Sequence, residues 1–158
     1  MIVVKTETFE MVSRHIRGTI YFECGETVFP DENWDDFVVI IQGWWLRIAR
    51  EYIDLPSDSS FSAKLLFMDG RFEVWISVNL LNGWGWKLEF IKPQNKNYII
   101  VCEINWIQPD HVLVSMEQAA SQTIEKCQQL SWSSSDLDEL IKQRDLTRIK
   151  LVELKTND

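Results

Sequence analysis

Three turn signals in the middle of the chain constrain its fold more than any other feature. The dipeptides Asp69-Gly70 and Asn82-Gly83 and the segment Pro93–Lys96 separate four stretches that are rich in apolar residues. Asp-Gly and Asn-Gly supply the positive φ angles that tight hairpin turns require. The sequence therefore predicts an antiparallel meander of four strands, over residues 61–68, 71–79, 84–91 and 97–107.

Alternation along these strands predicts two faces of the sheet. The opposite, outer face mixes charged side chains with an apolar centre formed by Trp75, Ile99 and Val101. The inner face is predicted to hold Phe72, Val74, Ile76, Val78, Trp84, Trp86, Leu88, Phe90, Tyr98, Ile100, Cys102, Ile104 and Trp106.

A long amphipathic helix is predicted over residues 34–52, because residues 37, 41, 44 and 48 follow the spacing of one helix face. Asn33 is its predicted N-cap. Asp35 and Asp36 then fall in the first turn, where the helix dipole favours negative charge. We expect this helix to pack on the inner face of the meander.

The two ends of the chain complete an α+β fold, predicted as a single domain over residues 1–158. Strands are expected over 8–12 and 16–23, and a short strand over 111–114. Ser115 opens a capping-box pattern for a helix over 116–130, and Ser135 caps a second helix over 136–144. The tail 148–155 is open between strand and helix. We expect the C-terminal helices to cover the outer face of the meander and bury Trp75.

Composition bounds the partners of this chain. Its formal net charge of -8 disfavours nucleic acid and anionic membranes and suits a basic protein partner, although solubility alone also explains such acidity. Three cysteines without CxxC spacing are predicted to be reduced thiols. The chain has neither a signal-peptide pattern nor an apolar run long enough to cross a bilayer, so we expect a cytoplasmic protein.

No residue pattern indicates catalysis, a metal or a cofactor. The two histidines, His15 and His111, have no acid or thiol at a catalytic spacing. The acids at 31, 32, 35 and 36 lack the alternating pattern and the glycine of a calcium loop. Gly83-Trp84-Gly85 does not lead into a helix, as a phosphate-binding loop would.

Two segments are similar to immunity proteins of bacterial polymorphic and contact-dependent toxin systems. They are Trp34-Asp35-Asp36-Phe37 leading to Trp44-Trp45-Leu46, and Leu66-Phe67-Met68-Asp69-Gly70-Arg71-Phe72. The resemblance covers about a quarter of the chain and implies a non-enzymatic cytoplasmic protein that binds and blocks the toxin domain of a sister cell. It supplies no catalytic residues.

Three hypotheses follow. The first is an immunity protein that binds its toxin through acids, with Trp75 as an apolar anchor. The second is a small-molecule-binding or regulatory domain whose ligand lies between helix and sheet, lined by Trp44, Trp84 and Trp86. The third is an enzyme that uses carboxylates alone, drawn from Glu10, Glu23 and Glu26. The toxin-binding acids of the first hypothesis are Asp31, Glu32, Asp35, Asp36, Asp54 and Asp58.

Overall fold

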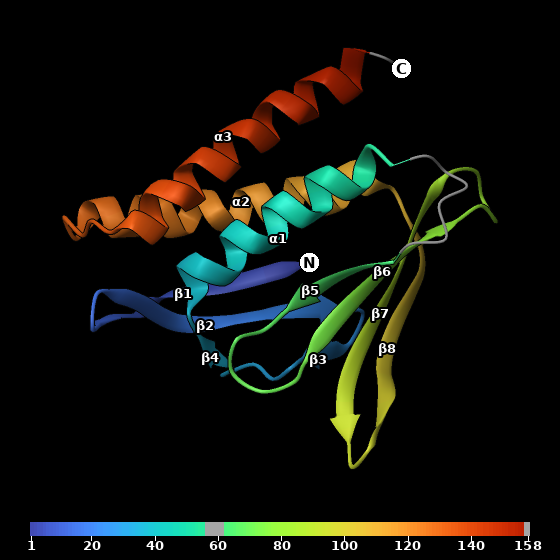
Figure 1. The fold of residues 1–158 in the computed structure, drawn as a ribbon, viewed down its shortest axis with the longest axis horizontal. Coiled ribbons are helices and arrows are strands. Elements are labelled where there is room, and N and C mark those ends of the chain that lie inside the picture. The colour runs from blue at the N-terminus through green and yellow to red at the C-terminus, as the bar shows by residue number, and fades with distance from the viewer. Residues whose placement is uncertain (56–61, 157–158) are drawn as a thin grey trace.

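The fold is an α+β arrangement of two antiparallel sheets and a layer of helices. The computed structural model describes residues 1–55 and 62–156, and within them the chain forms two four-stranded sheets and three helices. The helices lie together on one side of the molecule and the sheets on the other (Figure 1). The predicted α+β class, with a meander and C-terminal helices, is therefore confirmed.

The first sheet is built around β2 (His15–Cys24). It pairs with β1 (Ile2–Val12) on one side and with the short strands β3 (Thr27–Phe29) and β4 (Asp35–Asp36) on the other. The register of β1 shifts between Lys5 and Glu10. This irregularity brings the Phe9 ring onto Gly18, where an added Cβ would lie only 2.3 Å from a ring carbon.

The second sheet is the predicted meander. Its strands β5 (Ala63–Leu66), β6 (Glu73–Asn79), β7 (Gly85–Gln94) and β8 (Asn97–Ile107) are hydrogen-bonded in chain order. Gly70, Gly83 and Asn95 have φ angles of 82°, 88° and 55°. These are the left-handed conformations that the turn dipeptides predicted.

Two register shifts in β8 correct the predicted inner face. Alternation holds through Ile104 and Cys102, which pair with Leu88 and Phe90. The shift beyond Phe90 then pairs Ile100 with Ile91 and turns Tyr98 and Ile100 to the outer face. The shift near Trp86 places Ile107 opposite it instead of Trp106. The inner-face prediction for Tyr98, Ile100 and Trp106 is therefore wrong, because each bulge inverts the alternation.

The long helix α1 (Val38–Ile53) starts later than predicted. Phe37 is its N-cap and donates no side-chain hydrogen bond. Asp35 and Asp36 are extended and pair with Thr19 and Gly18 of β2. The prediction that these acids occupy the first helical turn is wrong, because pairing with β2 holds this segment as a strand.

The C-terminal helices are longer than predicted. Helix α2 (Pro109–Gln129) begins at a proline, which is well suited to a first helical position, and includes the segment predicted as a strand over 111–114. Ser115 is not its cap, since its Oγ accepts the Ile2 backbone N–H at 2.9 Å. Helix α3 (Ser135–Thr156) continues through the ambiguous tail, where Leu151 and Leu154 pack against the core.

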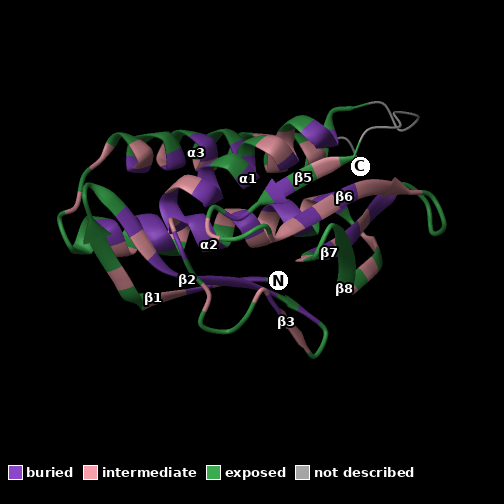
Figure 2. Ribbon diagram, turned by 60° about the horizontal axis from the view of Figure 1, so that its bottom comes forward, coloured by how far each residue is buried: buried purple, intermediate pink, exposed green. Residues whose placement is uncertain are grey.

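The core lies between the helical layer and the two sheets, as the buried residues in Figure 2 show. An aromatic cluster marks the place where α1 meets both sheets. Trp45 of α1 lies 5.0 Å from Phe22 and 5.0 Å from Phe67, and Phe29 lies 5.4 Å from Phe90, measured between ring centroids. Such tilted and edge-to-face pairs add stability beyond the apolar area they bury.

Cysteine usage differs from the prediction. Cys24 of β2 and Cys102 of β8 form a disulfide that joins the two sheets, and Cys127 is a buried free thiol. The prediction that all three cysteines are reduced is wrong, because β2 and β8 approach each other at this point. Among the described helices, none has an apolar stretch sufficient to traverse a bilayer.

Candidate protein-binding surface

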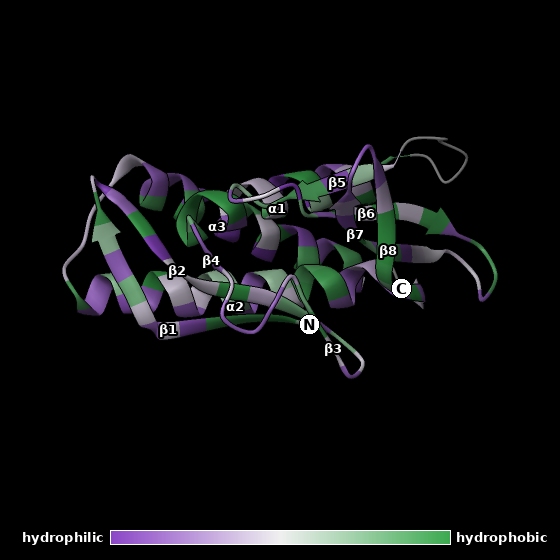
Figure 3. Ribbon diagram, turned by 90° about the horizontal axis from the view of Figure 1, so that it is seen from below, coloured by the Kyte–Doolittle hydropathy of each residue, from purple (hydrophilic) through white to green (hydrophobic). Residues whose placement is uncertain are grey.

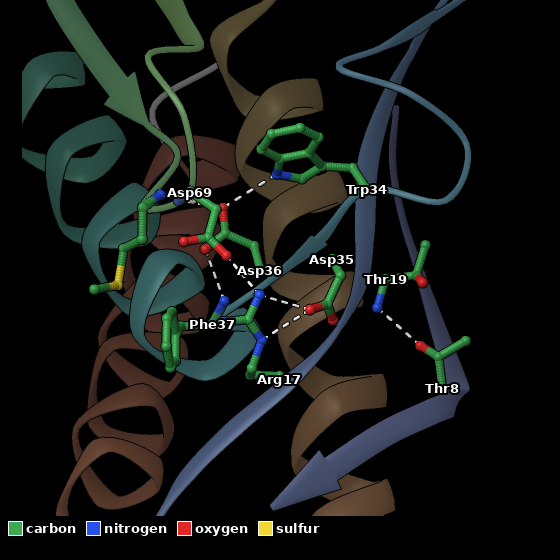
Figure 4. A network of polar contacts seen from close by, with 9 residues as sticks. Thr8, Arg17, Thr19, Trp34, Asp35, Asp36, Phe37 and Asp69 are labelled. Carbon is green, nitrogen blue, oxygen red and sulfur yellow. Dashed lines mark hydrogen bonds and ion pairs between the residues drawn. The ribbon is translucent and has the colours of Figure 1, made fainter. Parts of the chain in front are cut away.

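Arg17 gathers two loops at the start of α1 (Figure 4). Its Nη2 lies 2.6 Å from the Asp35 carboxylate and 2.5 Å from the Asp69 carboxylate. The guanidinium also lies over the Phe37 ring, 4.6 Å from its centroid. The hydrogen bond to Asp35 is the main reason that the pKa of Arg17 is raised. Arg17 therefore fixes the β5–β6 loop against the segment that precedes α1.

Asp36 is the buried centre of this network. Its Oδ1 accepts the Phe37 backbone N–H at 2.7 Å. Its Oδ2 accepts the Trp34 indole N–H at 3.2 Å and the backbone N–H groups of Met68 at 3.1 Å and Asp69 at 3.3 Å. Burial raises the pKa of this carboxyl, and the hydrogen bonds oppose that shift. Asp36 is fully buried, so it holds the loops together and cannot touch a partner.

Four carboxylates remain at this end of the molecule, and we call Asp31, Glu32, Asp35 and Asp69 the loop-end acids. Asp31 and Glu32 are exposed on the loop between β3 and β4. The Asp31 carboxylate accepts the Asn33 N–H at 2.8 Å. The cations bonded into the same loops are Arg17 and Lys5, the latter through Asn33. Four carboxylates against two cations leave this end negative.

The other predicted toxin-binding acids do not join the loop-end acids. Asp54 caps the opposite end of α1, a helix of 16 residues that spans about 24 Å. There its carboxylate pairs with Lys150 of α3. Asp58 lies outside the residues that the structure describes. The six acids predicted as one surface thus include a buried one and a distant one.

Trp75 lies on an uncovered face. The prediction that a C-terminal helix covers this face is wrong, because α2 and α3 pack with α1 instead (Figure 1). Trp75 is half-buried by its own sheet: the Tyr98 ring lies 4.8 Å from it and the Lys64 ammonium 4.5 Å from its ring centroid. Lys87 lies 3.0 Å from both Glu89 and Glu103, and these hydrogen bonds raise the pKa of Lys87.

The end of the β7–β8 hairpin carries an apolar run that is exposed on both faces. We call Tyr98, Ile99, Ile100 and Val101 the hairpin run, and each of its side chains is at least 40% exposed. Viewed from below, hydrophobic residues of β8 lie on the surface (Figure 3). Among the described residues, β8 pairs only with β7, so its outer edge offers unpaired backbone groups.

Sequence reasoning missed the exposure of the hairpin run. Four consecutive apolar residues are equally typical of a strand buried on both faces. The flanking Lys92, Lys96 and Asn97 were the available signal, because polar residues on both sides of a tight turn suit a solvent-exposed hairpin end.

The residues of the two alternative hypotheses are not assembled as predicted. Trp86 is fully buried, whereas Trp44 and Trp84 are more than a third exposed and line separate surface hollows. Glu10 pairs in register with Arg17, six residues along β2 from Glu23, or about 20 Å. Paired catalytic carboxylates lie within about 10 Å of each other.

Within the described residues, no group of three or more His, Cys, Asp or Glu side chains is arranged to hold a metal ion. Comparison with known proteins found no matching family model, no matching curated protein and no matching solved structure.

Proposed function

We propose that this chain is an immunity protein that binds and neutralises a cognate toxin domain in the bacterial cytoplasm. The observation that carries the proposal is the hairpin run, which lies with Trp75 on a sheet face that no described element covers. Soluble proteins rarely leave such a run exposed unless it contacts something. Two of the segments on which the resemblance to immunity proteins rests lead to this region, through Trp34 and through the β5–β6 loop.

The loop-end acids supply the charged part of the proposed surface. Ile91 pairs with Glu73, the first residue of β6, so the β7–β8 hairpin extends past β6 at the end where the β5–β6 loop carries Asp69. The apolar run would provide affinity, and the acids would steer a basic partner. Many toxins of this kind are nucleases with basic faces, which matches the sign of this end.

The first experiment is binding to the toxin domain encoded beside the gene, with rates measured by surface plasmon resonance at several salt concentrations. The double variant Asp31→Lys, Glu32→Lys should slow association roughly tenfold and flatten its salt dependence. The matched control is Glu51→Lys, Glu125→Lys, which makes the same change in net charge on exposed positions of α1 and α2. The control should associate at a rate close to that of the wild type.

The second experiment tests the apolar part. Tyr98→Ala, Ile100→Ser should raise the dissociation rate at least tenfold, or about 1.4 kcal/mol, without lowering the melting temperature, because both side chains are exposed. Failure of the wild-type protein to bind the toxin domain would refute the immunity function. Binding that both double variants leave unchanged would refute this surface while keeping the function.

A further inference from the structure

A second apolar feature lies on the inside of the molecule. A pocket of about 280 Å³ opens where the two sheets meet beneath α2. The first residues of β1 lie at this place, between the sheets (Figure 1). Its lining comes from three elements that are distant in sequence: Phe22 of β2, Leu88 and Phe90 of β7, and Val112 of α2.

The walls of the pocket are built and fixed. Phe22 and Phe90 are buried and lie 5.6 Å apart between ring centroids, so the floor is aromatic. The disulfide between Cys24 and Cys102 stands two residues beyond Phe22 on one wall and two residues before Ile104 on the other. A crosslink between the walls holds their spacing, so the space is part of the folded structure.

Polar groups occur only at the α2 side of this pocket. His111 is exposed and Ser115 is half-buried one helical turn further on. Ser115 Oγ accepts the Ile2 N–H, and among the described residues no acceptor takes its hydroxyl proton. A hydroxyl can donate one hydrogen bond in addition to those it accepts. The pocket thus combines an apolar interior with hydrogen-bond donors on one side.

We propose that this pocket binds a small amphipathic molecule with an apolar body and one hydrogen-bond-accepting end. An apolar cavity of about 150 Å³ accommodates benzene, so the present volume suits a body of roughly ten non-hydrogen atoms. The body lies against Phe22, Leu88 and Phe90, and its carbonyl or carboxylate end accepts from Ser115 or His111. This inference is independent of toxin binding, since the pocket contains none of the loop-end acids.

The test uses decanoate as the probe and methyl NMR of the whole protein labelled at Ile, Leu and Val. We expect saturable binding with one site, and shifts of the methyl groups of Ile2, Leu88, Ile104 and Val112. Ile99 and Ile149 are exposed elsewhere and should not shift. Decylammonium, which has the same chain length but donates hydrogen bonds, should bind at least tenfold more weakly.

Two matched variants on β8 complete the test. Ile104→Trp fills the pocket and should weaken decanoate binding at least tenfold, whereas Ile100→Trp is an exposed position on the same strand and should leave it unchanged. Ile107→Phe replaces the first variant if that protein does not fold. The proposal is overturned if decanoate shows no saturable binding to the wild type by about 1 mM, or if the shifts appear at Ile99 and Ile149. It is also overturned if decylammonium binds equally well or the filled variant retains its affinity.

Discussion

At the scale of single residues, Asp36 determines how α1 begins. One buried carboxylate accepts hydrogen bonds from two loops, through Phe37 on one side and Met68 and Asp69 on the other. Asp36→Ala leaves these buried N–H groups without their acceptor. We expect a loss of about 2–4 kcal/mol in the free energy of unfolding, measured by urea denaturation. Asp31→Asn, on the exposed part of the same loop, should change it by less than about 0.5 kcal/mol.

The titration of Asp36 gives a second prediction. Burial raises its pKa in the folded state above the ordinary value of 3.8. Protonated Asp36 therefore favours the folded state, and this contribution is present below the unfolded pKa and is lost as the pH rises through the folded pKa. The destabilisation caused by Asp36→Asn should be larger at about pH 4 than at about pH 7. Urea titrations of both proteins across this range would contradict the assignment if the difference were constant or reversed.

At the scale of elements, one buried polar contact joins α1 to α2. The Gln42 amide Nε2 donates to Val38 O at 2.9 Å and to Thr123 Oγ1 at 2.8 Å. Both residues are buried, so removing one partner strands the other. Thr123→Val and Gln42→Met should each cost about 1–3 kcal/mol.

The double variant Gln42→Met, Thr123→Val should cost less than the sum of the two single variants, since no polar group is then left unpaired. A double-mutant cycle by thermal or urea denaturation measures this coupling. Strictly additive losses would show that the contact contributes nothing of its own.

The sequence was informative about elements whose signals are local. The meander could be predicted because Gly70 and Gly83 need their conformations within the turn itself. Ser115 shows the opposite case: its pattern looked like a local cap, but its partner is the Ile2 backbone, 113 residues away. The start of α1 was missed for the same reason, because Asp36 is bound by residues of the β5–β6 loop.

The candidate site was predictable only in part. Acids before α1 and an outward Trp75 follow from composition and alternation. Which acid is buried, and that Asp69 belongs with Asp35, depends on Arg17 of a different strand. The exposure of Tyr98 and Ile100 depends on a bulge, and an uninterrupted apolar run contains no signal for one.

At the scale of the whole molecule, the disulfide connects the two sheets. It links positions that are 78 residues apart, so it restricts the unfolded chain strongly. We expect reduction to lower the free energy of unfolding by about 2–4 kcal/mol, measured by urea denaturation with and without dithiothreitol. A Cys127→Ser background removes the free thiol, and the further variant Cys24→Ser, Cys102→Ser should ignore dithiothreitol. Identical curves for oxidised and reduced protein would contradict the expectation.

The uncovered edge of β8 also affects how the protein behaves alone. An exposed strand with apolar side chains on both faces is a template for pairing with another copy of itself. Lys92 and Lys96 lie at the turn and repel a second hairpin end, but the hairpin run itself carries no charge. The isolated protein should therefore be limited in the concentration it tolerates before it aggregates, and an occupied hairpin should raise that limit. Co-expression with its partner would then increase the soluble yield as well as neutralise the toxin.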